Sequence, residues 1–425
     1  MIKIMDYALL GEDIFIRGDE ATGVEDVVAD IIYDVRKNGD KALYEYSRKF
    51  DKVELSCLEV TKEEIDAAFA SVDPALIEII REAKENIKAF HENQKRSGFM
   101  MTTPGGAVMG QRVLPLDKVG LYVPGGTAAY PSSVLMNCVP AKIAGVEEIV
   151  MVTPPSKDGG VNPVILAAAK IADVGRIFKI GGAQAVAALA YGTESVPRVD
   201  KIVGPGNRFV AEAKKQVFGQ VAIDMIAGPS EILVIADGKS NPAFVAADLL
   251  SQAEHDRNAS AVLVTESREL AEAVSAELER QIPLLERADI ARESIDKNGK
   301  IIIVSSVEEA VDISNELAPE HLEVCVDSPF DLLDRIRHAG SVFLGRYCPE
   351  AVGDYFAGPN HTLPTSGTAR FSSPLSVDDF VKKMQYTYMT KPSLEKMYEK
   401  VAYFADSEGL GAHAESARIR FKDDK

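Results

Sequence analysis

The spacing of apolar positions divides the chain into a helical first part and a longer part in which short apolar runs alternate with helical segments. Within residues 22–96, apolar side chains recur every three or four positions, which predicts amphipathic helices. The clearest stripe comprises Leu76, Ile80, Ala83, Ile87 and Phe90. His91 follows this stripe near the helix end, and we expect it to be solvent-exposed.

The apolar runs from residue 119 onward fall into two groups of predicted strands. The first group comprises residues 119–123 (VGLYV), 148–152 (EIVMV), 176–180 (RIFKI) and 201–203 (KIV). The second comprises residues 232–235 (ILVI), 261–264 (AVLV), 301–304 (IIIV) and 341–344 (SVFL). Helical segments separate the runs, as is typical of a parallel sheet. We therefore expect an α/β protein with two Rossmann-like parallel-sheet domains and small helical terminal segments.

This order predicts the domain organisation, since 425 residues exceed what one ordinary core holds. We expect a first Rossmann-like domain from residues 21–118, with an acidic helical N-terminal part, together with residues 231–375. Residues 119–230 are expected to form the second. Residues 1–20 should pack with the tail, and residues 376–425 are helical and charged, with too little core to stand alone.

Composition restricts the class of protein. Hydrophobic residues make up 46% of the chain and charged residues 26%, the balance of a soluble globular protein. The net charge of -18 argues against nucleic acid or an anionic membrane as the main partner, because phosphate binding needs clustered Lys and Arg. We find neither a signal peptide nor an apolar run near the ~18 residues of a membrane helix, so we expect a cytoplasmic protein.

The cysteines show no paired spacing. Cys57, Cys138, Cys325 and Cys348 are scattered along the chain without a CxxC pair. Each is predicted to be a small buried hydrophobic residue in a reducing compartment.

The adjacent residues Glu320 and His321 are the strongest candidates for proton chemistry. They follow Pro319 and precede an apolar run that is typical of a strand. A carboxylate and an imidazole are the groups most often used to move protons near neutral pH. The pattern alone nevertheless favours an ordinary surface pair at a helix end.

Glycine turns follow three of the predicted strands, at residues 125–126, 181–182 and 204–206. Such a turn presents backbone N–H groups and a positive helix end to an anion. None completes the GxGxxG pattern, because Phe209 occupies the last glycine position of the third turn. Together the turns are as consistent with a nucleotide or another phosphorylated ligand as with plain strand-to-helix turns.

Metal-binding side chains are present but not compactly spaced. Asn241-Pro242 suits a helix start, and Gln252 and His255, three residues apart, share a face near that helix's end. Other candidates lie at Asp354, His361 and His413. Such side chains suit zinc when they converge, but their spacing matches no compact zinc motif, so spacing alone predicts no metal site.

Eight short segments, taken in order, resemble the histidinol dehydrogenase family over nearly the whole chain. They are residues 120–126 (GLYVPGG), 181–185 (GGAQA), 204–207 (GPGN), 227–231 (AGPSE), 251–255 (SQAEH), 318–323 (APEHLE), 353–355 (GDY) and 360–365 (NHTLPT). We see no departure at a position that the family uses for chemistry.

This resemblance implies a zinc-dependent, four-electron oxidation of L-histidinol via L-histidinal to L-histidine. Two NAD⁺ are reduced, and these are the last steps of L-histidine biosynthesis. One zinc ion per subunit would be held by Gln252, His255, Asp354 and His413. The same four residues would bind substrate together with Ser230, His321 and Glu408. Tyr122, Gln184 and Asn207 would bind NAD, which makes residues 119–230 the NAD-binding domain.

The resemblance also implies a homodimer, in which the tail of one subunit completes the site of the other. His321 would take the hydroxyl proton in both oxidations, and Glu320 would activate the water that hydrates the aldehyde. Two alternatives stay open. A zinc hydrolase would use Glu320 as base without changing a nicotinamide, and a non-catalytic NAD-binding scaffold would lose nothing when His321 is replaced.

Overall fold

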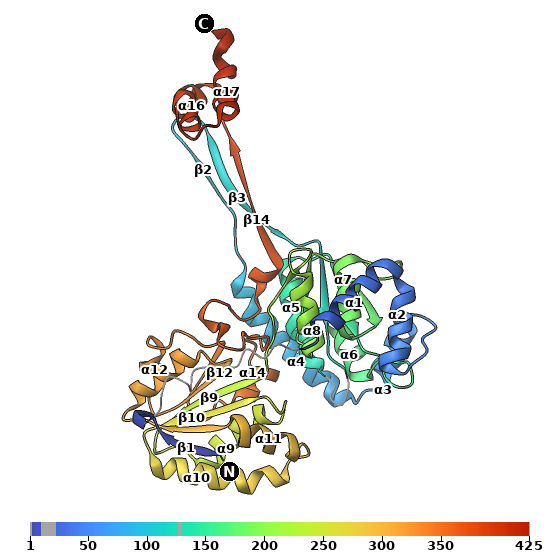
Figure 1. The fold of residues 1–425 in the computed structure, drawn as a ribbon, viewed down its shortest axis with the longest axis vertical. Coiled ribbons are helices and arrows are strands. Elements are labelled where there is room, and N and C mark those ends of the chain that lie inside the picture. Colours follow the sequence, from blue (N-terminus) through green and yellow to red (C-terminus); the bar gives the residue numbers. More distant parts are fainter. Residues whose placement is uncertain (1, 10–22, 126–129, 425) are drawn as a thin grey trace. The chain divides into compact units, whose positions relative to one another are not determined.

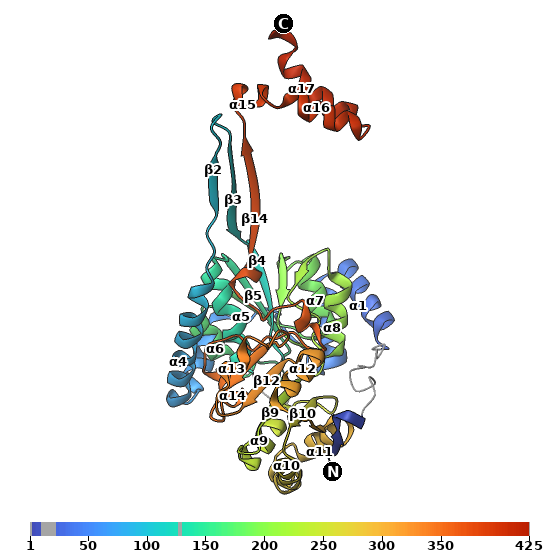
Figure 2. The same ribbon diagram turned by 90° about the vertical axis from the view of Figure 1, so that its left-hand side faces the viewer.

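A computed structural model describes residues 2–9, 23–125 and 130–424, and Figures 1 and 2 label its elements. Two compact units are present: residues 2–94 with 116–380, and residues 95–115 with 381–424. We call them unit 1 and unit 2 and describe each by itself. Within the described ranges, no helix combines the length and apolarity that crossing a membrane requires.

Unit 1 contains a parallel five-stranded sheet. Its strands are β4 (Lys118–Tyr122), β5 (Glu148–Thr153), β6 (Arg176–Lys179), β7 (Lys201–Val203) and β8 (Ala222–Ile223). Their order is β6-β5-β4-β7-β8, and every pairing is parallel. The first four match the predicted strands closely, because strands buried on both faces read as continuous apolar runs.

Helices cover both faces of this sheet, giving three layers (Figure 2). One face carries α1 (Glu25–Asn38), α2 (Asp40–Tyr46), α7 (Gly182–Tyr191) and α8 (Arg208–Val217). The other carries α3 (Lys62–Ser71), α4 (Pro74–His91), α5 (Pro131–Ala144) and α6 (Pro163–Ala172). The helices of residues 25–91 therefore pack on this sheet, not with residues 231–375 as expected. An amphipathic stripe predicts that a face is buried but does not identify the sheet that buries it.

A second parallel sheet in unit 1 has six strands. They are β1 (Lys3–Asp6), β9 (Glu231–Ala236), β10 (Ser260–Thr265), β11 (Lys300–Ile303), β12 (His321–Cys325) and β13 (Ser341–Leu344), in the order β1-β11-β10-β9-β12-β13. One face carries α9 (Pro242–Ala253), α10 (Arg268–Gln281) and α11 (Ala288–Asn298). The other carries α12 (Val307–Leu317) and α13 (Phe330–Leu333). The α/β class with two parallel sheets is thus confirmed.

The N-terminal segment contributes to the six-stranded sheet, and its packing with the tail stays a prediction. Residues 3–6 form the edge strand β1, in which Ile4 pairs with Ile301 of β11. A four-residue edge strand needs only one neighbour and leaves little hydrophobic pattern to read. Residues 10–20 lie outside the described residues.

Unit 2 combines an antiparallel sheet with helices. Its strands are β2 (Phe99–Thr102), β3 (Val108–Pro115) and β14 (Val381–Tyr388), in the order β14-β3-β2, and its helices are α15 (Lys391–Glu395), α16 (Tyr398–Ser407) and α17 (Gly411–Arg418). The tail was expected to be helical throughout, and β14 corrects this. Its partner β3 lies far earlier in the chain, so pairing over a long sequence separation decides the conformation of residues 381–388.

Two expectations about burial are also corrected. His91 is fully buried, and its Nδ1 lies 2.7 Å from Gln94 Oε1. Asn360, from a distant segment, covers it and lies 3.5 Å from its Nε2. Of the cysteines, Cys57 is exposed and Cys348 half-buried, whereas the other two are buried as predicted. Whether a residue is buried by segments distant in sequence cannot be predicted from its neighbours in the chain.

Phe178 on β6 tests the core of the five-stranded sheet, because its side chain is fully buried there. Replacing Phe178 with Ala should lower the free energy of unfolding by about 3–5 kcal/mol, since the cavity cannot fully collapse. Urea denaturation measures this change. The matched variant Phe330→Ala, at a position that is 74% exposed, should change it by less than about 0.5 kcal/mol. Equal losses in the two variants would contradict this assignment of the core.

Candidate active site

Glu320 and His321, the pair predicted from the sequence, are both held by the backbone of Glu231. The Glu231 N–H donates to Glu320 Oε2 at 2.9 Å. His321 Nδ1 lies 3.0 Å from the Glu231 carbonyl oxygen, and a carbonyl only accepts, so Nδ1 carries the proton. Parallel pairing of β12 with β9, in which His321 lies opposite Ile232, brings these groups together. One residue therefore orients both members of the pair.

The backbone that enters the pair is constrained on both sides. Helix α12 ends at Leu317, and the capping residue Ala318, whose φ of +46° is left-handed, sharply redirects the chain before Pro319. The Gly340 N–H donates to the Pro319 carbonyl at 2.9 Å. A Cβ atom at Gly340 would lie 2.5 Å from the Glu320 carbonyl oxygen, so this close approach requires glycine. The junction predicted before the strand is thus a rigid turn and not a surface loop.

Three histidines of unit 1 share one tautomer. His321 is the first. The Nδ1 of His255 lies 2.9 Å from the Ser251 carbonyl oxygen, and the Nδ1 of His361 lies 3.2 Å from the backbone carbonyl oxygen of Asp354. Each Nδ1–H is therefore a donor to backbone, so the lone pair of a neutral ring lies on Nε2. Histidines held in this way are suited to bind metal or accept a proton.

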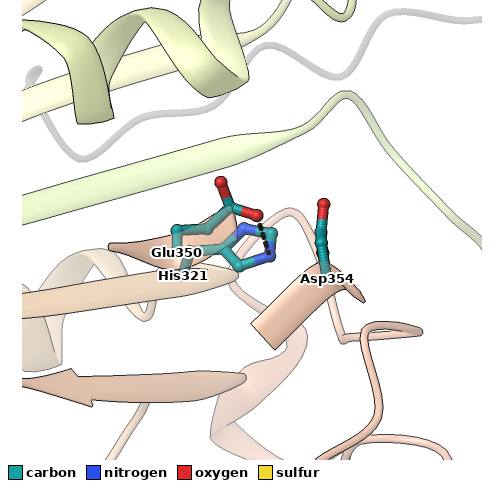
Figure 3. A group of neighbouring side chains, drawn as sticks. All are labelled: His321, Glu350 and Asp354. Carbon is teal, nitrogen blue, oxygen red and sulfur yellow. Dashed lines mark ion pairs between the residues drawn. The ribbon is translucent and has the colours of Figure 1, made fainter. Parts of the chain in front are cut away.

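Two carboxyl groups of helix α14 (Glu350–Tyr355) face His321 (Figure 3). Glu350 and Asp354 are four residues apart and so share a helix face. Glu350 Oε1 lies 3.9 Å from His321 Nε2, and the three side chains each offer a ligand atom, all within 4.8 Å of one another. Burial, with the neighbouring Glu350 charge and hydrogen bond, raises the pKa of Asp354 to about 9. At neutral pH, Asp354 therefore holds its proton while Glu350, whose pKa is lowered, is ionised.

These side chains fit a divalent cation. Among the described residues, His321 Nε2 and Glu350 Oε1 are buried atoms that could bind a cation and have no hydrogen-bond partner. Gln252 is 1% exposed and lies beside the Glu350 carboxyl. Buried polar atoms without partners are costly, and imidazole, carboxylate and amide groups are donors that zinc and related ions accept. A cation bound here would take the place of the proton on Asp354.

Burial shifts the pKa values of Glu320 and His321 in opposite directions. It raises the pKa of Glu320 well above its ordinary value, even though the Glu231 N–H stabilises the ionised form. It lowers the pKa of His321, an effect that outweighs the nearby Glu350 charge. The imidazole is thus neutral at pH 7 and ready to accept a proton, whereas the carboxyl holds its proton more strongly than an exposed glutamate.

The structure gathers part of the predicted substrate and metal set. Gln252 lies in the last turn of α9, His255 follows in the next turn, and Ser230 directly precedes β9. With Asp354, Glu320 and His321, they lie at the amino ends of β9 and β12, where the order of the six-stranded sheet reverses. Glu408 and His413 are exposed residues of unit 2, so their association with this cluster stays a prediction.

Glu350 is the site residue that sequence reasoning missed. It is buried, its backbone N–H donates to Glu323 Oε1 at 2.7 Å, and its Oε2 accepts from the Ser251 hydroxyl at 2.9 Å. Its position could have indicated that it shares a helix face with Asp354, because it follows Pro349 and precedes Asp354 by one helical turn. His361, considered only as a possible ligand, lies against Asp354 in the structure.

The predicted NAD residues lie at the carboxyl end of the five-stranded sheet. Tyr122 ends β4, Gln184 lies in the first turn of α7, and the Asn207 side chain caps α8 by accepting from the N–H groups of the next turn. The Tyr122 hydroxyl accepts from the Gly182 N–H at 3.0 Å. Sheet order reverses between β4 and β7, and ligands of open parallel sheets bind at such a switch point. Gly126, in the first predicted turn, lies outside the described residues.

Comparison with known proteins gives one consistent family. A sequence profile of the family described as histidinol dehydrogenase matches residues 17–421. The histidinol dehydrogenase of Clostridium acetobutylicum is 57% identical over 99% of this chain and 98% of its own length, and that of Bacillus cereus is 56% identical over 95% and 94%. A crystal structure of histidinol dehydrogenase from Elizabethkingia anophelis superimposes with a TM-score of 0.92 at 38% identity, over 99% of this chain and 98% of that one. The chain belongs to the histidinol dehydrogenase family.

Proposed function

We propose that this chain oxidises L-histidinol via L-histidinal to L-histidine, with reduction of two NAD⁺, as the last steps of L-histidine biosynthesis. The observation that carries the proposal is the double anchoring on Glu231, which fixes His321 with a free Nε2 beside a carboxyl of raised pKa. Family membership supports the substrate. A role in amino-acid biosynthesis also fits a cytoplasmic location.

We assign the metal site to zinc, one ion per subunit, held by Gln252, His255, Asp354 and the His413 of a second copy. The raised pKa of Asp354 and the Nε2 of His255, left available because Nδ1 faces a backbone carbonyl, support this donor set, in which Gln252 would bind through its amide oxygen. When bound, zinc would grip the imidazole and amine of the substrate and orient it. Ser230, His321 and Glu408 complete the proposed substrate contacts.

NAD is assigned to the switch point of the five-stranded sheet, in contact with Tyr122, Gln184 and Asn207. NAD would accept the hydride that leaves the substrate carbon. The buried Tyr122 and Gln184 flank the start of α7, where backbone N–H groups favour an anion such as a pyrophosphate. The exposed Asn207 lies at the start of the neighbouring helix α8.

In the first oxidation, His321 accepts the hydroxyl proton of L-histidinol on Nε2 as the carbon loses hydride. The Glu231 carbonyl stabilises the resulting imidazolium, because Nδ1–H already donates to it. The proton must pass to solvent before the next step.

In the second oxidation, water first adds to the aldehyde. Glu320 takes one proton from this water as its oxygen bonds to the carbonyl carbon, and a proton from solvent goes to the carbonyl oxygen, giving a hydrate. A carboxylate with a raised pKa is the stronger base once it is ionised. His321 then takes a hydroxyl proton of the hydrate as the second hydride leaves, and L-histidine results.

The proposed assembly is a homodimer in which residues 376–425 complete the partner's site. Unit 2 exposes large apolar side chains that a partner would cover, including Phe99, Met100, Met101, Tyr403 and Phe404. Exposed apolar groups of this number are typical of a protein interface. The same unit carries Glu408 and His413, which explains why a segment with little core of its own would hold site residues.

NADH absorbance with L-histidinol as substrate tests the reaction. Two NADH should form per L-histidinol, and a chelator should abolish the reaction until zinc is restored, because the donor set is built for a cation. Substrate turnover without NADH would favour the zinc hydrolase. A product that stops at the aldehyde would contradict the second step.

Substitution of the pair separates its two roles. His321→Asn should slow both oxidations by about 10²–10⁴-fold, the usual contribution of a general base. Glu320→Gln should spare the first oxidation and slow the oxidation of added L-histidinal by a similar factor. His338→Asn and Glu308→Gln, at positions outside the site, serve as matched controls and should retain wild-type rates. Equal losses in both steps for Glu320→Gln would refute the division of labour, and an active His321→Asn variant would favour the scaffold alternative.

The two steps should respond differently to pH. The raised pKa of Glu320 means that this base is lost as pH falls through a range where an exposed glutamate is still ionised. The lowered pKa of His321 keeps the imidazole neutral over the same range. Lowering the pH through that range should therefore reduce L-histidinal oxidation more than the first hydride transfer. Rapid-mixing profiles of NADH formation for each substrate measure this, and parallel profiles would be the contrary result.

A further inference from the structure

A buried ion pair lies where the third glycine turn begins. Lys214 of α8 contacts Asp224, which follows β8, and their side chains are 2% and 1% exposed. Lys214 Nζ donates to the Gly204 carbonyl at 3.0 Å, and the Gly204 N–H donates to Asp224 Oδ2 at 2.7 Å. The pair therefore binds both backbone polar groups of one residue, the glycine that follows β7.

Stability alone is a poor explanation for this arrangement. Removing two charges from water costs several kcal/mol per ion, and well-packed apolar residues in their place are often neutral or stabilising. What a buried, hydrogen-bonded pair supplies and apolar residues do not is a fixed orientation of the groups that it binds. Here those groups belong to the turn at residues 204–207.

Gly204 connects the Lys214–Asp224 ion pair to the other predicted nucleotide contacts. Its φ is +115°, and a Cβ atom would lie 2.1 Å from the Tyr122 carbonyl oxygen, so the turn packs directly on Tyr122. The Tyr122 hydroxyl in turn accepts from the Gly182 N–H of the second glycine turn. On the other side, Asn207 caps the helix that carries Lys214. A shift of Gly204 would thus move several groups at the switch point together.

We propose that Lys214 and Asp224 are positioning residues that hold the turn at residues 204–207 in its nucleotide-binding geometry. The inference rests on the proposed binding of NAD at this turn. Neither side chain reaches the surface, so both act through Gly204 and not by contact with the nucleotide. The proposal ascribes to the ion pair a specific effect on NAD affinity, separate from the affinity for L-histidinol.

The test compares Asp224→Asn with Asp379→Asn in the whole protein. Asp379 pairs with Lys201 at 2.8 Å, at the start of the same strand β7, and makes no contact with the turn. Asp224→Asn should raise the Kd for NAD, measured by calorimetry, and the KM for NAD about tenfold. The KM for L-histidinol at saturating NAD should change by less than about twofold. Asp379→Asn should leave all three values unchanged, whatever its effect on Tm.

A merely structural role would give a different result. Loss of Tm without weaker NAD binding in Asp224→Asn, or equal weakening in Asp379→Asn, would overturn the proposal. If Asp224→Asn does not fold, Lys214→Gln, which keeps a donor for the Gly204 carbonyl, is judged by the same criterion. If the wild-type protein itself binds no NAD, the proposed function fails and this inference fails with it.

Discussion

The site depends on the two hydrogen bonds made by the backbone of Glu231, one to each member of the adjacent acid and base. Neither side chain could be so precisely oriented by a flexible loop, because each has its own rotamer freedom. The parallel pairing of β9 with β12 supplies the donor and the acceptor at fixed positions. The same bonds set the tautomer of His321 and therefore decide which nitrogen faces the chemistry.

The two sheets place different kinds of candidate binding groups at their strand ends. In the five-stranded sheet, the predicted nucleotide contacts lie at the carboxyl ends of strands, where glycine turns open helices. In the six-stranded sheet, the proton-handling pair lies at the amino end of β12, and the helix that follows β9 returns Gln252 to the same end. Binding of an anion needs exposed backbone N–H groups, whereas proton transfer needs buried side chains with shifted pKa values. Each sheet meets one of these needs.

The sequence predicted the interior of the fold better than its edges. Strands such as β5 and β9 were identifiable because burial on both faces makes them continuously apolar. The edge strand β1 and the antiparallel strand β14 were missed, because distant partners determine both. In the candidate site, His321 and Gln252 were predicted through residue type and family resemblance. Glu350 was missed because a carboxylate becomes notable only when it is known to be buried.

The turn that leads into the pair restricts which changes in chain length this region tolerates. Ala318 is left-handed, Gly340 touches the Glu320 carbonyl, and β12 lies between two partners. Side chains alternate along a strand, so inserting or deleting one residue here would turn His321 to the opposite face of the sheet. Insertions and deletions during evolution should therefore accumulate elsewhere in the chain. The spacing from Ala318 to His321 should therefore act as a fixed length, whichever residues flank it.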